Sequence, residues 1–263
     1  MKNNTMKSRF MARTSASVAA VCLLSGTAIT GGCKSPNLGG IFAMSKSQEI
    51  DIGQQSAAQI DRQERIVTSG PQYEQLQRVA ARILPLARRD YEVPFSVKLI
   101  DNKQVNAFAL PGGPIYFYTG LLDLASSDDE LASVLGHEAT HVVKRHSVKQ
   151  ISDAQAKGLI AQLALGNSSR TAQAVTGLLL QLDQLRFGRS DESQSDEIGF
   201  RYMTEAGYNP EAMASFFRKL GAKTGGGGGV EFLRSHPVTS KRVDAAEKRA
   251  KAYTAAQGGN AVK

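Results

Sequence analysis

The chain has 263 residues, of which 41% are apolar and 21% are charged. This apolar fraction excludes a wholly disordered chain, and no apolar run reaches the roughly 18 residues that a membrane-spanning helix needs. The formal net charge is +8, but residues 1–33 hold four of the 32 basic side chains and no acidic one. The rest of the chain has 28 basic against 24 acidic residues. Since these form no stripe interleaved with aromatic residues, we expect no nucleic-acid partner.

Residues 1–32 have the composition of a lipoprotein signal peptide. Basic side chains are followed by small and apolar residues over 16–29, and then by two glycines and Cys33. This order is typical of a secretory signal, and a cysteine at this place resembles the lipobox cysteine that becomes diacylated. An ordinary signal with an incidental cysteine is the alternative. We predict a lipidated tether at 33–44. Lys34 follows the cysteine where bacterial lipoproteins retained in the inner membrane typically carry Asp, so the resemblance favours the outer membrane.

Residues 45–255 are predicted to form one α+β domain that is mostly helical and has a small sheet. Alternation of apolar residues indicates a strand at 95–100, and a Pro-Gly-Gly turn indicates a hairpin between 105–110 and 115–118. Residues 256–263 are expected to be a frayed tail. Apolar spacing and capping residues predict helices at 45–67, at 73–87, from Ser127 to beyond His146, within 151–185, at 187–206, at 209–220 and at 239–255, with a five-glycine loop at 225–229.

Two of the four histidines lie in the sequence H-E-A-T-H at residues 137–141. On a helix, residues i and i+4 share a face with their Cβ atoms roughly 5–6 Å apart, which suits two imidazoles that bind one zinc ion. Glu138 lies about 100° around the helix, where it can take a proton from metal-bound water. Apolar neighbours predict that this helix is buried, where imidazoles and carboxylates are costly unless paired or metal-bound. The sequence therefore predicts one Zn²⁺ bound by His137 and His141, against the alternative of a surface helix with two incidental histidines.

A catalytic zinc site needs a third protein ligand, and no cysteine follows position 33. The candidates are carboxylates, with His146 and His236 as rivals. Because His146 comes five residues after the second motif histidine, we expect it to point away from the pair and to be structural. The acidic cluster 191–197 places Glu192 and Asp196 on one helix face, so Glu192 can bind the metal while Asp196 hydrogen-bonds a ligand imidazole. The alternative is a solvated helix start.

Several sequence blocks within residues 45–255 resemble, in the same order, the gluzincin zinc endopeptidases that include the CAAX prenyl protease and the HtpX-like enzymes. The soluble periplasmic branch of that family is the most similar. The resemblance implies a gluzincin-type metalloprotease fold whose active-site helix carries H-E-x-x-H. The matching blocks are Asn106-Ala107-Phe108 with Pro111-Gly112-Gly113, Asp129-Glu130-Leu131-Ala132, the H-E-x-x-H motif with His146, Arg189-x-x-Glu192-x-x-x-Asp196-x-x-Gly199, Ala206-Gly207-Tyr208-Asn209-Pro210, and Phe232-Leu233-Arg234-Ser235-His236-Pro237 with Arg242.

The resemblance also implies roles for single residues. Glu192 matches the third zinc ligand of the family, and Asp196 matches the residue that supports a ligand imidazole. His236 matches an active-site histidine that stabilises the oxyanion or takes the fourth metal position at rest, and Arg242 matches an arginine suited to the same stabilisation. A loop histidine and an exposed arginine are the alternatives. The edge strand that pairs with substrate backbone corresponds to Asn106, Ala107, Phe108 and Ala109, unless these form a simple core hairpin.

The predicted function is that of a zinc-dependent endopeptidase of the bacterial cell envelope. Its expected substrates are misfolded or unassembled envelope proteins, with Glu138 as the proton acceptor and donor. The expected location is the periplasm, with the chain anchored to the outer membrane through a lipid on Cys33. One alternative is a chaperone-like assembly lipoprotein with low or latent protease activity. Another is a scaffold lipoprotein with a relic metal site.

Overall fold

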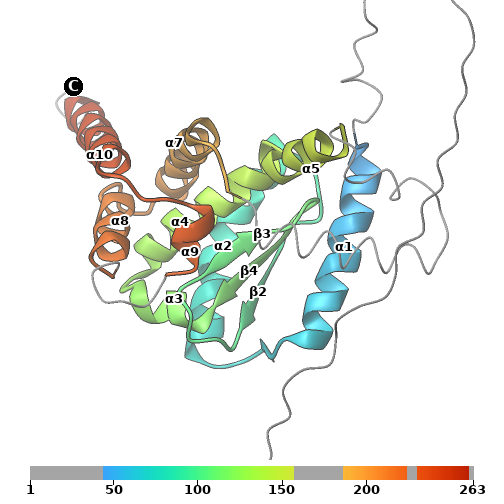
Figure 1. The fold of residues 1–263 in the computed structure, drawn as a ribbon. Helices are drawn as coiled ribbons and strands as arrows, with labels where there is room; N and C mark the ends of the chain where they lie inside the picture. The colour runs from blue at the N-terminus through green and yellow to red at the C-terminus, as the bar shows by residue number, and fades with distance from the viewer. Residues whose placement is uncertain (1–43, 157–185, 224–229, 261–263) are drawn as a thin grey trace, which may run out of the picture. The chain divides into compact units, whose positions relative to one another are not determined.

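A computed structural model describes residues 44–156, 186–223 and 230–260 of the chain (Figure 1). The predicted signal peptide, almost all of the predicted tether, the region 157–185 and the five-glycine loop lie outside the described residues. Within the described part, no helix is both long and apolar enough to cross a membrane.

Four strands form a mixed sheet in the order β1-β2-β4-β3. The predicted strand is confirmed as β2 (Ser96–Ile100), which runs parallel to β4 (Pro114–Tyr118). The predicted hairpin is confirmed by the antiparallel pairing of β3 (Ala107–Ala109) with β4. The sequence predicts a helix over 45–67, but its last two residues form strand β1 (Ile66–Val67). These two β-branched residues instead pair with the end of β2 and extend the sheet by one strand.

The two faces of the sheet are covered by different helices. Side chains of α1 (Lys46–Gln63) pack against Ile100 and Tyr116 on one face. On the other face, Leu99 and Phe117 join the main core, to which α2 (Pro71–Asp90) and α4 (Asp128–Val143) contribute. This division follows from the two-residue period of a strand, which sends successive side chains to opposite faces. The remaining described helices are α3 (Thr119–Leu124), α5 (His146–Ala156), α7 (Arg189–Glu205), α8 (Ala212–Lys223), α9 (Phe232–Ser235) and α10 (Ser240–Asn260).

Helix α4 is the central helix of the domain, and Glu130 to Val142 are all buried in it. Ser127 caps its first turn by accepting a hydrogen bond from the Glu130 amide, as the capping box predicts. The prediction that this helix runs past His146 is wrong. The helix ends at Val143 because Arg145 adopts a left-handed backbone conformation with φ of 56°, and α5 begins at the next residue.

The C-terminal helix is longer than the sequence indicated. Helix α10 extends to Asn260, so residues 256–260 continue the helix instead of fraying from it. Ala255, Ala256 and Gln257 have high helix propensity, which accounts for the extension.

Helices α4 and α7 cross at a close contact between two glycines. A Cβ atom on Gly136 would lie 2.8 Å from the carbonyl oxygen of Gly199, and one on Gly199 would lie 2.7 Å from the backbone nitrogen of His137. Larger side chains would therefore push the two helices apart. The contact brings the acidic first turns of α7 within reach of the H-E-x-x-H motif.

Candidate metal centre

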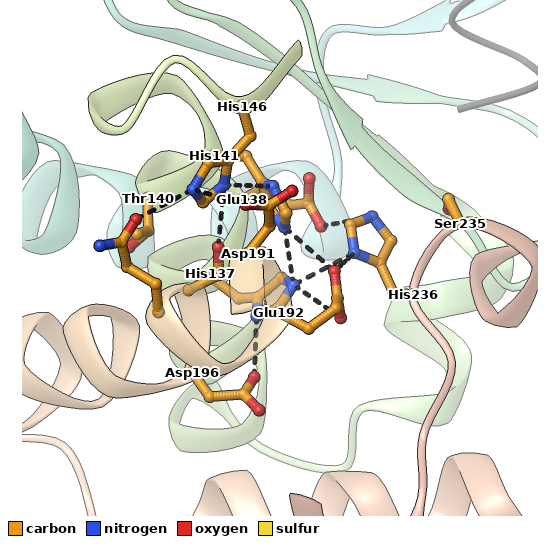
Figure 2. A network of polar contacts seen from close by, with 12 residues as sticks. His137, Glu138, Thr140, His141, His146, Asp191, Glu192, Asp196, Ser235 and His236 are labelled. Atoms are coloured by element: carbon orange, nitrogen blue, oxygen red, sulfur yellow. Dashed lines mark hydrogen bonds and ion pairs between the residues drawn. The ribbon is translucent and has the colours of Figure 1, made fainter. Parts of the chain in front are cut away.

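The H-E-x-x-H residues of α4 form the floor of a buried polar cluster. His137, Glu138 and His141 are 3%, 1% and 1% exposed. The imidazole Nε2 atoms of His137 and His141 lie 3.1 Å apart. The alternative of a surface helix with incidental histidines is thus excluded, and both nitrogens face one point, as Figure 2 shows.

Helix α7 adds two carboxylates to this cluster. The Glu192 carboxylate lies 3.4 Å from His141 Nε2 and 3.6 Å from His137 Nε2. One turn later, Asp196 Oδ1 lies 3.0 Å from His137 Nδ1. Both side chains are buried, so the alternative of a solvated helix start is excluded for them.

His236 enters the cluster from the segment that follows α9. Its Nδ1 atom lies 3.2 Å from His137 Nε2 and 2.9 Å from Glu192 Oε1. The imidazole ring stacks between two phenylalanines, with ring centroids 5.1 Å from Phe187 and 4.6 Å from Phe232. These contacts hold the ring at the centre, so it is not an ordinary loop histidine.

Four donor groups, from His137, His141, Glu192 and His236, have the spacing of a metal site. All four ligand atoms lie within 4.8 Å of one another. A tetrahedral ion with bonds of about 2.0–2.1 Å, the lengths found in zinc sites, holds its donors about 3.3 Å apart. The contacts around the cluster run from 2.9 to 3.6 Å, on both sides of this value. The buried Glu138 Oε1 has no hydrogen-bond partner within the described residues and lies 3.5 Å from His236 Nε2, so it keeps the capacity to accept a hydrogen bond from a water at the cluster. The residues therefore fit a metal ion.

The hydrogen bonds behind the histidines fix which nitrogen faces the centre. His137 donates from Nδ1 to Asp196, which leaves the lone pair of Nε2 directed at the cluster. His141 Nδ1 lies 3.0 Å from His146 Nδ1, and His146 Nε2 lies 3.0 Å from Gln194 Oε1. If His141 Nδ1 donates to His146 Nδ1, and His146 Nε2 donates to Gln194 Oε1, each of these four atoms has a hydrogen-bond partner. The lone pair of His141 Nε2 is then left to bind metal.

This contact corrects the expectation that His146 points away from the pair. The break at Arg145 changes the direction of the chain, so that His146 comes back to the buried imidazole of His141. No glycine or proline marks this break in the sequence, which is why helical spacing misplaced the side chain.

Arg242 lies behind the carboxylates and is 9% exposed. Its Nε and Nη2 atoms lie 2.8 Å and 2.6 Å from the two oxygens of Asp196, and its Nη1 atom lies 2.5 Å from Glu192 Oε2. Nη1 also donates to the backbone oxygen of Pro237, 2.9 Å away. One guanidinium therefore holds both carboxylates and the turn next to His236, and the alternative of an exposed arginine is excluded.

The comparisons with known proteins agree with this geometry. The model of Peptidase family M48 matches residues 71–250. These residues make up more than half of the chain and contain every residue of the cluster. The chain belongs to peptidase family M48.

Three relatives of this M48 chain illustrate the range of its similarities. The mitochondrial metalloendopeptidase OMA1 of Schizosaccharomyces pombe is 32% identical over 167 residues, which are 63% of this chain and 49% of the relative. The beta-barrel assembly-enhancing protease of Escherichia coli is 31% identical over 170 residues, 60% of this chain and 35% of the relative. The OMA1 protein of Arabidopsis thaliana is 36% identical over 155 residues, 57% of this chain and 30% of the relative. The matches thus span between 30% and 49% of the relatives' lengths.

Burial and charge shift the pKa values in the M48 site in opposite directions. Burial lowers the pKa of His141 well below 6.5 and raises that of Glu138. Burial also acts to lower the pKa of His137, but Glu192 and Asp196 outweigh it and raise the pKa to about 9. For Glu192, burial is outweighed by His137 and His236, which lower its pKa. These shifts favour an ionised Glu192 and a neutral His141, the forms in which the two side chains bind a cation.

The predicted substrate strand lies at one edge of the M48 sheet. Its Ala107 and Ala109 side chains join the core on the α4 side, whereas Phe108 faces α1 and stacks on Tyr116 with ring centroids 5.2 Å apart. The residue before the strand, Asn106, accepts a hydrogen bond from Tyr118. In the described part of the chain, β3 pairs with β4 alone, which leaves its other side as the sheet edge.

Proposed function

We propose that the chain is a zinc-dependent endopeptidase of the bacterial cell envelope, with one Zn²⁺ held by His137, His141 and Glu192. The observation that carries the proposal is the convergence of these donors beside the buried Oε1 atom of Glu138, which has no hydrogen-bond partner among the described residues. Two histidines and a glutamate are a donor set that catalytic zinc sites use. Bound Zn²⁺ supplies a Lewis acid that polarises the scissile carbonyl and lowers the pKa of water.

Glu138 is the general base in this proposal. Its Oε1 atom is buried and has no hydrogen-bond partner among the described residues, so it is free to accept a proton from the attacking water. The pKa of the carboxyl is raised by burial, which makes it a stronger base than an exposed glutamate. The same oxygen then passes the proton to the leaving amine.

Asp196 and Arg242 hold the ligands in place. Asp196 fixes the tautomer of His137 by accepting from Nδ1, and Arg242 holds both Asp196 and Glu192. These contacts support Arg242 as a positioning residue. Its direct role in stabilising the oxyanion stays a prediction.

His236 is, in this proposal, the fourth ligand of the resting enzyme. Its Nδ1 atom lies at hydrogen-bond distance from two of the other donors, in the place that a catalytic site needs for water and substrate. The ring must therefore leave before a peptide carbonyl can enter. Its Nε2 atom lies 3.5 Å from Glu138 Oε1, so the displaced ring starts beside the reacting atoms, where it can stabilise the oxyanion.

The proposed substrates are misfolded or unassembled proteins of the cell envelope. An extended segment of such a protein would add to the free side of β3, where backbone hydrogen bonds give binding without a strict sequence requirement. The signal-like residues 1–32 support export, and one relative is named for enhancing β-barrel assembly. We place the chain in the periplasm, anchored to the outer membrane by a lipid on Cys33.

Hydrolysis of unfolded casein by the purified protein tests the proposed activity. We expect slow cleavage that a zinc chelator abolishes and that one equivalent of Zn²⁺ restores. Cleavage that is unaffected by chelation would contradict the zinc mechanism.

Incorporation of labelled palmitate in cells tests the proposed anchor. We expect label on the wild-type chain and none on Cys33→Ala. Equal label on both chains, or on neither, would contradict it.

A further inference from the structure

Glu49 on α1 is a fully buried carboxylate that contacts three separate parts of the domain. Its Oε1 atom accepts from the Gly112 amide at 3.1 Å, in the turn between β3 and β4. Its Oε2 atom accepts from Arg145 Nε at 2.8 Å and from the Tyr91 hydroxyl at 3.0 Å. A buried carboxylate is costly unless it is paired in this way.

Helix α1 is fixed tightly against that turn. A Cβ atom on Gly112 would lie 2.6 Å from Ile50 Cα, and one on Gly53 would lie 1.8 Å from the carbonyl oxygen of Pro111. The two backbones are therefore in direct contact, which fixes the position of the Glu49 backbone relative to the turn.

Arg145 occupies the junction between α4 and α5. Among the described residues, it is the only non-glycine residue in the left-handed region, with φ of 56°. Residues with a Cβ atom adopt this conformation at a cost, so something must hold it. The side chain is held by Glu49 through Nε and by the backbone oxygen of Met44 through Nη2, which is 2.6 Å away.

The left-handed junction determines where His146 lies. Had α4 continued, His146 would point around the helix and away from His141. With the break, its Nδ1 atom lies 3.0 Å from His141 Nδ1 (Figure 2). Its Nε2 atom lies 3.0 Å from Gln194 Oε1. The acceptor for the buried N–H of a metal-binding imidazole is thus supplied by the junction.

We propose that Glu49, acting through Arg145 and His146, is a positioning residue that orients His141 for metal binding. The inference rests on the proposed metal centre and adds a link between α1 and one of its ligands. The ion pair of Glu49 with Arg145 stabilises the left-handed junction, the junction places His146, and His146 fixes the tautomer and direction of His141. Partners of this kind change metal affinity by about 10–100-fold when they are removed.

Zinc affinity, measured by competition with a chromophoric chelator, tests this chain of contacts. We expect Glu49→Gln to weaken zinc binding by about 3–30-fold, less than His146→Ala, which should lose about 10–100-fold. In the His146→Ala background, Glu49→Gln should cause no further loss, because both act through one contact. The visible absorption of bound Co²⁺ should change in the same way in both single variants.

Two substitutions at Arg145 distinguish the effect of its left-handed backbone conformation on zinc affinity from the effect of losing its side chain. Arg145→Gly removes the side chain but adopts a positive φ at little cost, whereas Arg145→Ala loses the ion pair and keeps the strain. We expect the glycine variant to bind zinc more tightly than the alanine variant. If the junction did not position His146 and His141, the two variants would bind zinc equally, even where their stabilities differ. These variants decide the matter if Glu49→Gln does not fold.

Asp61→Asn is the matched control on α1. It removes the charge that pairs with Lys98 and leaves an oxygen that can accept from the Tyr116 hydroxyl, and neither contact leads to His146. Its zinc affinity should equal that of the wild type. Either of two results would overturn the inference. One is a Glu49→Gln substitution that lowers zinc affinity equally in the wild-type and His146→Ala backgrounds. The other is an Arg145→Ala variant that binds zinc as tightly as Arg145→Gly. A folded wild-type chain that binds no zinc would instead contradict the metal centre itself, and the inference with it.

Discussion

His236 Nδ1 lies 3.2 Å from His137 Nε2, although 99 residues separate the two histidines in sequence. This is close to the separation of about 3.3 Å expected for two donors of one tetrahedral ion. In the proposed resting state this contact closes the position that catalysis requires to be open. His236 would then block the same site whose donors lie beside it.

Removing His236 should therefore raise activity. A closed state favoured by only about 1.4 kcal/mol would hide nine-tenths of the sites, so we expect His236→Ala to hydrolyse unfolded protein about tenfold faster. The variant should still bind one zinc ion through His137, His141 and Glu192. A lower rate with zinc still bound would contradict this prediction and would show that the oxyanion role of His236 outweighs its role as a blocking ligand.

The contact between Asp196 and His137 should contribute to zinc affinity. Asp196→Asn leaves the carbonyl acceptor but removes the negative charge beside His137 and Arg242. We expect zinc binding to weaken by about 10–100-fold in chelator competition. Glu197→Gln, an exposed neighbour on the same helix, should have no effect, and an equal loss in both variants would argue against a specific role.

The crossing of α4 and α7 should not tolerate a methyl group. In Gly199→Ala the new Cβ atom would lie 2.7 Å from the backbone of His137, so the helices must separate. We expect a loss of stability of about 1–3 kcal/mol in urea unfolding, together with weaker zinc binding. Gly221→Ala is the control, because a Cβ atom there meets nothing within 4 Å. An unchanged unfolding midpoint for Gly199→Ala would contradict the close crossing.

Acid should weaken the contact of Glu130 at the start of α4. Burial acts to raise its pKa, but Lys219, Ser215 and the Ser126 amide outweigh burial and lower it below 4.5. A carboxyl with a lowered folded-state pKa stabilises the protein above its ordinary pKa, and this contribution is lost as the pH falls through the folded value. Glu130→Gln should therefore cost about 1–3 kcal/mol at pH 7 and much less at pH 3, as measured by urea unfolding. A constant difference between wild type and variant across that range would contradict the ion pair.

The parts of the site that lie on one helix could be predicted from the sequence. The i, i+4 spacing places His137 and His141 on one face, and the same spacing places Glu192 and Asp196 together on another helix. What spacing could not supply was the packing of the two helices. That depends on the contact between two glycines, which periodicity does not reveal.

The error at His146 has a different cause. Residues 144–146 contain no glycine or proline that would end a helix, so the local pattern favours continuation. The break depends on the ion pair between Arg145 and Glu49, which is 96 residues away in the sequence. Contacts between residues so far apart in sequence can impose a backbone conformation that local propensity disfavours. A single sequence does not reveal such contacts. The missed strand β1 is similar, because its two residues are defined by pairing with β2.

The central claim is that one zinc ion and Glu138 together hydrolyse peptide bonds. The most direct measurement compares the zinc content and casein hydrolysis of the wild type with those of Glu138→Gln, each purified in the same way. We predict one zinc per chain in both proteins, with hydrolysis reduced by about 10²–10⁴-fold in the variant. Undiminished hydrolysis by a zinc-loaded Glu138→Gln protein would contradict the account.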